Sequence, residues 1–473
     1  MTASTSGHVV VLGGGIGGLA AAHALGRDDG TSPSRHVTLV EAGDRLGGKL
    51  RTETFRGRPF DVGADAFLAR VPGATELCQE IGLGDELEAP ASGRVHVWSR
   101  GRLRPLPEGL VLGVPARLLP LARSGLLSPA GLARAALDLV LPPSSFPDGD
   151  PTVGTLVGAR FGREVVERLV DPLLSGVYAG DVDRLSAAAT VPDLAAAAHA
   201  HRSLLLGLRA RRQVGTGGED ENGGSPLFYG VRDGMEQLVT RLVEHTPSLD
   251  VVLGDGAVRV TRAGAGYHVR LASGRELGAD AVVVAVPAFA AADLLADGWP
   301  DAAAELRAVE YASAAVVALA YERAAVDRPL DGSGFLVPRV EGRLVKACTW
   351  SSSKWPRLAG GDDVLLRCSV GRAGDDTALD MGDDELVGRV HAELARVMSL
   401  RAAPLESRVV RWERALPQYP PGHLDRVRRL DASLAGNPGL ALVGAAYEGV
   451  GLPAVIRRAE AVARRLRSVV TGG

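Results

Sequence analysis

The first fifty residues show two kinds of apolar pattern. The short apolar run His8–Leu12 is typical of a buried strand, and the small-residue stretch Leu19–Leu25 that follows is typical of a packed helix. A second apolar run, Val37–Val40, predicts another strand that ends at Glu41. This order of strand, helix and strand predicts a βαβ unit with a parallel sheet.

Similar signals return much later in the chain. Ala281–Val286 is wholly apolar, as expected for a strand buried on both faces. Near the C-terminus, Leu440–Gly444 predicts a strand and Ala454–Val469 predicts a helix. Because these signals lie at the start, middle and end, we predict one α/β domain assembled from separate segments.

The segments in between predict two further parts. Val251–Leu277 resembles a β-hairpin, and the patterns of Leu118–Leu127 and Leu132–Leu141 are helical, with arginines opposite the apolar face. These helices favour a helical subdomain over a ligand cavity; the alternative is a basic amphipathic patch on a membrane surface. Further strands are predicted at Ala312–Tyr321, Gly334–Val337, Arg343–Trp350 and Val364–Val370, and a helix at Asp384–Leu400.

At 473 residues the chain is too long for a single ordinary core. We predict a fold that combines α/β and α+β parts: a discontinuous Rossmann-like domain, an inserted mixed β-sheet substrate domain, and a helical subdomain. The predicted boundaries are 1–75, 229–290 and 430–473 for the first, 76–95 and 291–429 for the second, and 96–228 for the third. The polar segment 215–226 predicts a flexible surface loop.

The turn after the first strand contains five glycines around one isoleucine, Gly13–Gly18. Read as G-x-G-x-x-G, it lets backbone and helix N-terminus approach a pyrophosphate. Glu41 lies 23 residues beyond Gly18, close to the spacing expected for a ribose ligand, and its charge would repel a 2′-phosphate. The alternative is a glycine-rich turn with no ligand.

Three further segments favour FAD over NAD. Arg45–Gly48 has a glycine pair that would let a second stretch of backbone approach a longer cofactor. Gly278–Pro287 predicts a buried strand that ends in a proline turn. Gly449–Pro453 leads into the last helix, whose positive end would stabilise a reduced flavin.

Composition narrows the class of partner and the compartment. The net charge of −3 argues against nucleic acid as a partner. The cysteines Cys78, Cys348 and Cys368 are far apart, so neither a disulfide framework nor a metal site is predicted. No run reaches the about 18 apolar residues of a membrane span, and the short polar N-terminus lacks a signal peptide, so we predict a cytoplasmic protein.

Several distinctive stretches resemble the porphyrinogen oxidases of haem synthesis, within the amine-oxidase-like FAD superfamily. The resemblance covers nearly the whole chain and is greatest to the Gram-positive and actinobacterial coproporphyrinogen III oxidases. The stretches are FDVGADAFL at Phe60–Leu68, DPLLSGVYAGDVDRLS at Asp171–Ser186, KACTWSSSKWP at Lys346–Pro356, WERALPQYPPGH at Trp412–His423 and YEGVGLP at Tyr447–Pro453.

The resemblance implies which residues contact the cofactor and the substrate. The implied FAD contacts are Gly13, Gly14, Gly15, Ile16, Gly17, Gly18, Glu41, Ala42, Lys49, Gly63, Ala64, Asp65, Ala66, Val258, Trp412, Val450, Gly451 and Leu452. Arg70 is expected to pair with a substrate carboxylate, because a guanidinium binds carboxylates bidentately; the alternative is a solvated surface arginine. Gly176 and Tyr178 are candidates for lining the substrate cavity, with packing as the alternative.

One position departs from the wider superfamily. Many of its members carry an acid after the C-terminal glycine to bind the ribityl chain, whereas Ala445 and Ala446 follow Gly444 here. Backbone groups would then have to replace that carboxylate.

The resemblance implies oxidation of coproporphyrinogen III to coproporphyrin III, with dioxygen as acceptor and hydrogen peroxide as product. No catalytic side chain is predicted, because flavin N5 carries the chemistry. Protoporphyrinogen IX is the alternative substrate, and the next haem-pathway enzyme is a candidate partner. More distant alternatives are an amine oxidase or desaturase, for which Lys346 is the candidate lysine near the flavin, and a non-catalytic FAD-binding module.

Overall fold

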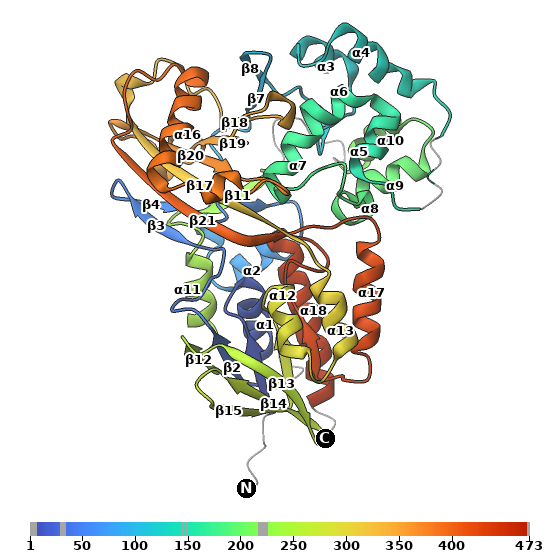
Figure 1. Ribbon diagram of the computed structural model, residues 1–473, viewed down its shortest axis with the longest axis vertical. Helices are drawn as coiled ribbons and strands as arrows, with labels where there is room; N and C mark the ends of the chain where they lie inside the picture. Colours follow the sequence, from blue (N-terminus) through green and yellow to red (C-terminus); the bar gives the residue numbers. More distant parts are fainter. Residues whose placement is uncertain (1–6, 29–34, 144–145, 147–148, 216–225, 471–473) are drawn as a thin grey trace.

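The computed structural model describes residues 7–28, 35–143, 146, 149–215 and 226–470. The molecule has a lower half built on a parallel sheet and an upper half in which a second sheet lies beside a group of helices (Figure 1). The α/β and α+β fold predicted from the sequence is therefore confirmed.

The lower half contains a parallel sheet with the strand order β12–β2–β1–β16–β22. The strands are β1 His8–Leu12, β2 His36–Glu41, β12 Leu249–Leu253, β16 Ala281–Val284 and β22 Leu440–Leu442. Four of them match the apolar runs of the sequence. The fifth, β12, pairs in parallel with β2 and so belongs to this sheet, not to the predicted hairpin.

Helices cover both faces of the parallel sheet. One face packs against α1 Ile16–Gly26, α2 Ala74–Glu80, α11 Gln237–Glu244 and α18 Leu452–Val470. The other packs against α12 Ala288–Leu295, α13 Pro300–Arg307, α17 His423–Ser433 and a small sheet of β13 Ala257–Ala263, β14 Gly266–Leu271 and β15 Glu276–Ala279. Burial on both faces explains why the inner strands β1 and β16, and β22 beside them, are almost wholly apolar.

The second sheet has seven strands in the order β21–β17–β20–β19–β18–β7–β8. Their bounds are β7 Val95–Ser99, β8 Arg102–Pro105, β17 Tyr311–Glu322, β18 Gly334–Leu336, β19 Ala347–Trp350, β20 Asp363–Val370 and β21 Glu406–Pro417. One face is covered by α16 Asp383–Met398. The other meets the hairpin β3 Thr52–Phe55 and β4 Arg58–Asp61, which reaches up from the lower half.

Short strands join the remaining segments. β5 Phe67–Leu68, β11 Phe228–Val231 and β6 Leu87–Glu88 form one small sheet, and β9 Leu110–Val111 and β10 Val114–Pro115 form another. The β5–β11 pairing places the end of the FDVGADAFL stretch against Phe228 and Tyr229.

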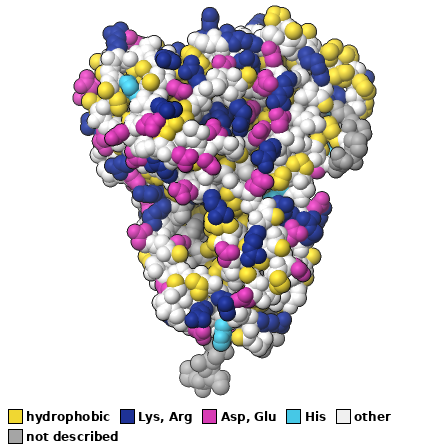
Figure 2. Space-filling view, viewed as in Figure 1, with side chains coloured by type: hydrophobic (Ala, Val, Ile, Leu, Met, Phe, Trp, Pro, Cys, Tyr) yellow, Lys and Arg dark blue, Asp and Glu magenta, His cyan; other side chains and the backbone are white. Residues whose placement is uncertain are grey.

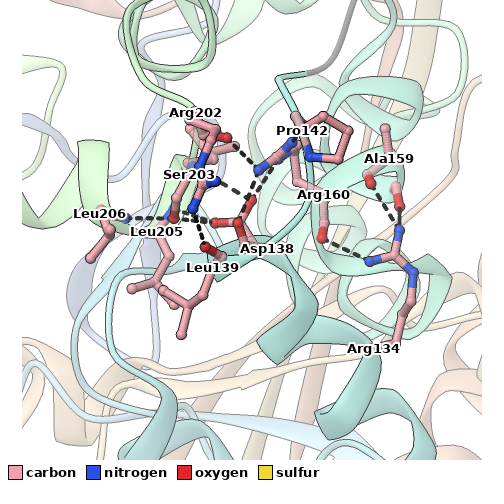
Figure 3. Close-up of polar contacts among 12 residues, drawn as sticks. Arg134, Asp138, Leu139, Pro142, Ala159, Arg160, Arg202, Ser203, Leu205 and Leu206 are labelled. Carbon is pink, nitrogen blue, oxygen red and sulfur yellow. Dashed lines mark hydrogen bonds and ion pairs between the residues drawn. The ribbon is translucent and has the colours of Figure 1, made fainter.

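The helical region lies beside the seven-stranded sheet. Its main helices are α3 Leu118–Ser124, α4 Pro129–Ala136, α5 Val153–Phe161, α7 Asp171–Tyr178, α9 Pro192–Ala200 and α10 Leu204–Gly215. At its centre Arg160 donates to the carboxylate of Asp138 at 2.5 Å, and both side chains are buried (Figure 3). The same carboxylate accepts from Ser203 and the Leu205 N–H, so it caps the start of α10 from a distant part of the chain.

Several elements lie in a different part of the molecule from the one that the predicted domain boundaries give them. β7 and β8 fall within 96–228 for most of their length but extend the seven-stranded sheet. α2 packs into the core of the parallel sheet, and so do α12, α13 and α17, because their buried apolar faces match that core. Residues 216–225 of the predicted surface loop lie outside the described residues.

The helical region leaves several apolar side chains exposed. Leu119 is 60 % exposed and Val140 is 66 % exposed, and Figure 2 shows apolar side chains gathered over this region. Within the described residues, no helix has the length and hydropathy needed to span a bilayer. Peripheral membrane contact through this region stays a prediction.

Candidate active site

The glycine loop lies between β1 and α1, at the carboxyl edge of the parallel sheet. A methyl group added at Gly18 would lie 1.9 Å from the carbonyl oxygen of Gly13, so only glycine lets the helix pack this closely. A methyl group at Gly15 would meet nothing within 4 Å, and its φ of −72° suits any residue. Unfilled space at a helix N-terminus fits the pyrophosphate predicted from the sequence.

The two neighbours predicted for this loop lie against it. Gly47 donates its N–H to the Gly14 carbonyl at 2.7 Å, so the Arg45–Gly48 segment does approach the loop. The Glu41 carboxylate accepts from the N–H groups of Gly14 at 2.7 Å and Gly43 at 2.8 Å. A carboxylate oxygen can accept more than one hydrogen bond, so Glu41 keeps capacity for a ribose hydroxyl.

The segment that contains Val258 lies beside Ala42. Gly254 donates its N–H to the Gly43 carbonyl at 2.8 Å, and a methyl group at Gly256 would lie 2.6 Å from the Ala42 side chain. Val258 falls where the β13–β14 register shifts, so its backbone is not paired in the ladder. Exposed polar backbone at this point suits recognition of the adenine end of the cofactor.

Lys49 lies between the glycine loop and residues 61–66. Its carbonyl accepts the Ala64 N–H at 3.1 Å, and a methyl group at Gly63 would lie 2.0 Å from that carbonyl oxygen. Lys49 is an exposed residue, but protein atoms crowd around its ammonium. The resulting desolvation lowers its pKa to about 8. None of the described residues forms an ion pair with its ammonium, so a phosphate fits beside it.

The backbone of residues 61–66 is oriented by side chains of the seven-stranded sheet. Arg367 of β20 donates to the carbonyls of Asp61 at 3.2 Å and Gly63 at 2.5 Å, and Trp412 of β21 donates to the Val62 carbonyl at 2.9 Å. The carbonyls therefore face the sheet. Within the described part of the chain, the N–H groups of Gly63, Asp65 and Ala66 have no acceptor. A flavin offers acceptors for such donors.

The C-terminal glycine segment is fixed by Tyr419. The Tyr419 hydroxyl accepts the Gly449 N–H at 3.1 Å and donates to the Ala445 carbonyl. The N–H groups that lead into α18, from Val450 to Leu452, find no acceptor among the described residues. They can therefore serve a ligand, and the positive end of the helix dipole favours an anionic one.

One face of the seven-stranded sheet is only half covered near the loop 61–66. Side chains on the opposite face, such as Cys348 and Cys368, are fully buried under α16. On the half-covered face, small or short side chains stand opposite one another on neighbouring strands: Leu336 pairs with Ala347, and Ala347 with Ser369. Figure 2 shows the surface hollowed at the waist below this sheet.

Helix α7 lies over the edge of this half-covered face. A methyl group at Gly176 would lie 4.0 Å from the Leu336 side chain, and Gly176 is exposed. Tyr178 instead packs inside the helical region, edge-on to Tyr419 at 5.9 Å, and burial raises its pKa to about 12. Gly176 therefore stays a candidate for lining the predicted cavity, whereas Tyr178 is a core residue of the helical region.

Arg70 and Lys346 differ in their surroundings. Arg70 is exposed just after β5, at the end of the loop that borders the predicted flavin position. Lys346 is 3 % exposed and donates to the Gly371 carbonyl at 2.8 Å, which leaves it no access to a ligand from solvent.

A surface hollow of about 270 Å³ lined by His8, Tyr267 and Asp280 lies at the opposite end of β1 and takes no part in this site.

Comparison with known proteins shows which family the chain belongs to. Residues 16–467 match the sequence model of the family described as flavin containing amine oxidoreductase. The chain belongs to this family. Flavin is therefore its cofactor, and the glycine loop, Glu41 and the loop 61–66 provide a site suited to FAD.

Relatives of known name cover nearly the whole chain. It is 37% identical over 456 residues to a coproporphyrinogen III oxidase of Bacillus subtilis, covering 96% of each chain. It is 39% identical to a Mycobacterium tuberculosis protein of the same name, covering 97% of this chain and 96% of that one. A crystal structure of an Exiguobacterium protein named as a protoporphyrinogen oxidase is 32% identical, with a TM-score of 0.85 over 98% of this chain and 99% of the other.

Sequence reasoning missed the side chains that orient the loop 61–66. Arg367 stands on a strand of otherwise apolar pattern, and Lys354 and Arg357 lie in or beside the quoted stretch KACTWSSSKWP. A charged residue within an apolar strand is a signal that a polar partner lies nearby. The partner itself lies in a segment far away in sequence and could not be identified without the tertiary structure.

Proposed function

We propose that this flavin-containing oxidoreductase is a coproporphyrinogen III oxidase. The observation that carries the proposal is identity of 37–39% over nearly the full length to relatives of that name. The half-covered sheet face beside the loop 61–66 adds support, because a large macrocycle needs a broad surface next to the flavin. The reaction would be oxidation of coproporphyrinogen III to coproporphyrin III in the coproporphyrin-dependent route to haem b.

Making the macrocycle aromatic removes six electrons and six protons, so three two-electron steps are required. Bound FAD supplies the two-electron acceptor for each step, and we propose that dioxygen restores it with release of hydrogen peroxide. The protein's part is to hold one bridging carbon of the macrocycle beside the flavin and to exclude water. The N–H groups of Gly63, Asp65, Ala66 and residues 450–452, which have no acceptor among the described residues, would hold the cofactor for this geometry.

Four propionates distinguish this substrate from a more apolar porphyrinogen. Arg70 is exposed just after β5, the short strand that follows the loop 61–66, and a guanidinium there can bind a carboxylate bidentately. Gly176 of α7 leaves room above Leu336 for the ring. No side chain is proposed as a general base, and the pyrrole nitrogens offer their own routes for the protons.

Protoporphyrinogen IX is the second candidate substrate. It is favoured by the name of the Exiguobacterium protein, whose structure is similar over the whole chain. The two substrates differ in charge, because protoporphyrinogen has two propionates in place of four. A direct assay with both substrates decides between them.

A paired assay tests the proposal. Purified protein loaded with FAD is mixed in air with coproporphyrinogen III or protoporphyrinogen IX, and porphyrin fluorescence and peroxide are recorded together. We expect three peroxides per porphyrin and a higher kcat/KM with coproporphyrinogen. A preference for protoporphyrinogen would transfer the assignment to the second candidate. Oxidation of neither would favour the non-catalytic module, and oxidation of amines would favour an amine oxidase.

A further inference from the structure

The segment Lys354–Arg357 spans the end of the distinctive stretch KACTWSSSKWP and the residue after it, and the proposed reaction gives it no role. It follows the short helix α14 Ser351–Lys354. Ser352 accepts the Leu365 N–H at 2.9 Å, and Ser353 donates to the carbonyls of Leu330 at 2.7 Å and Gly332 at 2.8 Å. These bonds fasten the start of the segment to β20 and to the loop that precedes β18.

Trp355 holds two cations in place. The Lys354 ammonium and the Arg357 guanidinium each lie 4.6 Å from the centre of its ring, and the ring itself is buried. Such contacts stabilise a cation that has lost part of its hydration. The Trp355 ring lies 2.8 Å from a methyl group added at Gly230, so β11 also packs closely on it.

Both cations reach the loop that borders the flavin position. The Lys354 ammonium lies 2.7 Å from the Asp65 carboxylate, and the two side chains are only 14% and 20% exposed. Arg357 donates to the carboxylates of Asp61 at 2.9 Å and Glu88 at 2.8 Å. The segment Lys354–Arg357 therefore fixes the two ends of the loop 61–66.

The charge of Asp65 depends on these neighbours. Burial by itself would raise its pKa, but Lys354 and then Arg367 outweigh burial, so its pKa lies well below the usual value. Asp65 is thus ionised at neutral pH, next to backbone N–H groups that have no acceptor among the described residues. Without a cation beside it, this carboxylate would oppose the negative charge that a flavin gains on reduction.

We propose that Lys354 is a positioning residue for the flavin, which acts through its ion pair with Asp65. The pair keeps the N–H groups of Gly63, Asp65 and Ala66 turned toward the cofactor, and it cancels the charge of Asp65 so that the flavin is easier to reduce. This role concerns FAD alone. It does not depend on which porphyrinogen is the substrate.

The two halves of the pair make opposite predictions for the flavin reduction potential. Lys354→Met leaves the Asp65 charge unopposed, so the potential should fall and the FAD dissociation constant should rise about tenfold. Asp65→Asn leaves the Lys354 charge unopposed, so the potential should rise. The reduction potential of the double variant should lie between those of the two single variants. Lys354→Arg should stay near wild type in both its reduction potential and its FAD dissociation constant.

The experiment measures FAD affinity by quenching of flavin fluorescence and the potential by dye-coupled reduction, with no porphyrinogen present. Arg408→Met is the control, because it breaks an exposed ion pair with Glu53 on the neighbouring hairpin without touching the loop 61–66. Equal potentials in the Lys354→Met and Asp65→Asn proteins, or shifts of the same sign, would overturn the proposal. If Lys354→Met does not fold, the rise expected for Asp65→Asn decides the matter by itself.

Discussion

At the scale of single residues, Gly15 and Gly18 are equivalent in the sequence motif but not in space. Gly18 is required by the protein, because a side chain there would strike the Gly13 carbonyl. Gly15 is not required by any protein contact, because a side chain there would enter empty space. The packing of α1 therefore explains the third glycine, and we propose that a ligand explains the second.

These two glycines give a matched pair of variants. Gly15→Ala should leave the thermal unfolding of the apoprotein within about 0.5 kcal/mol of wild type but weaken FAD binding at least about tenfold. Gly18→Ala should destabilise the apoprotein itself by about 1–3 kcal/mol, because the helix must move. Calorimetry and a flavin fluorescence titration separate the two effects. Normal FAD affinity in Gly15→Ala would contradict the assignment of the pyrophosphate to this space.

Arg70 tests the substrate side of the site. Arg70→Ala should raise the Michaelis constant for coproporphyrinogen about tenfold and change kcat much less, because a propionate contact is present in both ground and transition states. Arg70→Lys keeps the charge but not the bidentate geometry, so its Michaelis constant should lie between those of wild type and Arg70→Ala. Unchanged steady-state kinetics would make Arg70 an ordinary surface residue.

Lys346 gives a prediction about pH. Burial, with Arg372 and Arg367 nearby, lowers its pKa from 10.5 to about 7. Between these values the unfolded chain holds a proton that the native protein lacks, so stability rises with pH, by at most about 1.4 kcal/mol per unit.

Lys346→Met removes this titration. The difference in free energy of unfolding between wild type and Lys346→Met should therefore grow in favour of wild type from about pH 7.5 to about pH 9.5. Urea unfolding at several pH values measures it, and a difference independent of pH would show that Lys346 titrates normally.

At the scale of elements, two of the strands that the sequence patterns missed lie at the edges of a sheet. β8 and β21 are the outermost strands of the seven-stranded sheet, and both carry several arginines. An edge strand has fewer apolar neighbours, so its sequence lacks the continuous apolar run that identifies the buried strands. β7 pairs in parallel with β18, a partner far away in the chain. No local pattern indicates such a pairing.

The helical region depends on its buried ion pair. Arg160→Met would leave the Asp138 carboxylate buried without its cation, which costs about 3–5 kcal/mol. We expect lower thermal stability and faster hydrogen exchange in α10, whose start Asp138 caps, with FAD affinity unchanged. The control is Arg211→Met, which removes an exposed ion pair with Asp193 and should cost less than about 1 kcal/mol. Equal effects of the two variants would contradict a central role for Asp138 and Arg160.

At the scale of the whole molecule, the candidate site exists only because three parts meet. The parallel sheet supplies the glycine loop, the seven-stranded sheet supplies Arg367 and Trp412, and the helical region supplies α7 above Leu336. Figure 1 shows these parts converging at the waist of the molecule.

The half-covered sheet face gives the prediction that belongs to this scale. Ala347→Trp should fill the space between β19 and α7 and lower kcat/KM for coproporphyrinogen at least about a hundredfold, because the macrocycle would no longer fit. FAD affinity should stay near wild type, since the cofactor contacts lie on other segments. Ala347→Ser, which changes the volume little, is the control. Full activity of Ala347→Trp would place the substrate elsewhere.

The sequence by itself determined the parallel-sheet strands other than β12, the glycine loop between β1 and α1, and the flavin family. These follow from local patterns, because a strand buried on both faces and a helix packed on glycine constrain neighbouring residues directly. The tertiary structure alone decided that Arg367, Trp412 and Lys354 hold residues 61–66, and that Tyr178 is a core residue. Such contacts join residues far apart in the chain, so their geometry is set by strand register and sheet order, which no local pattern contains.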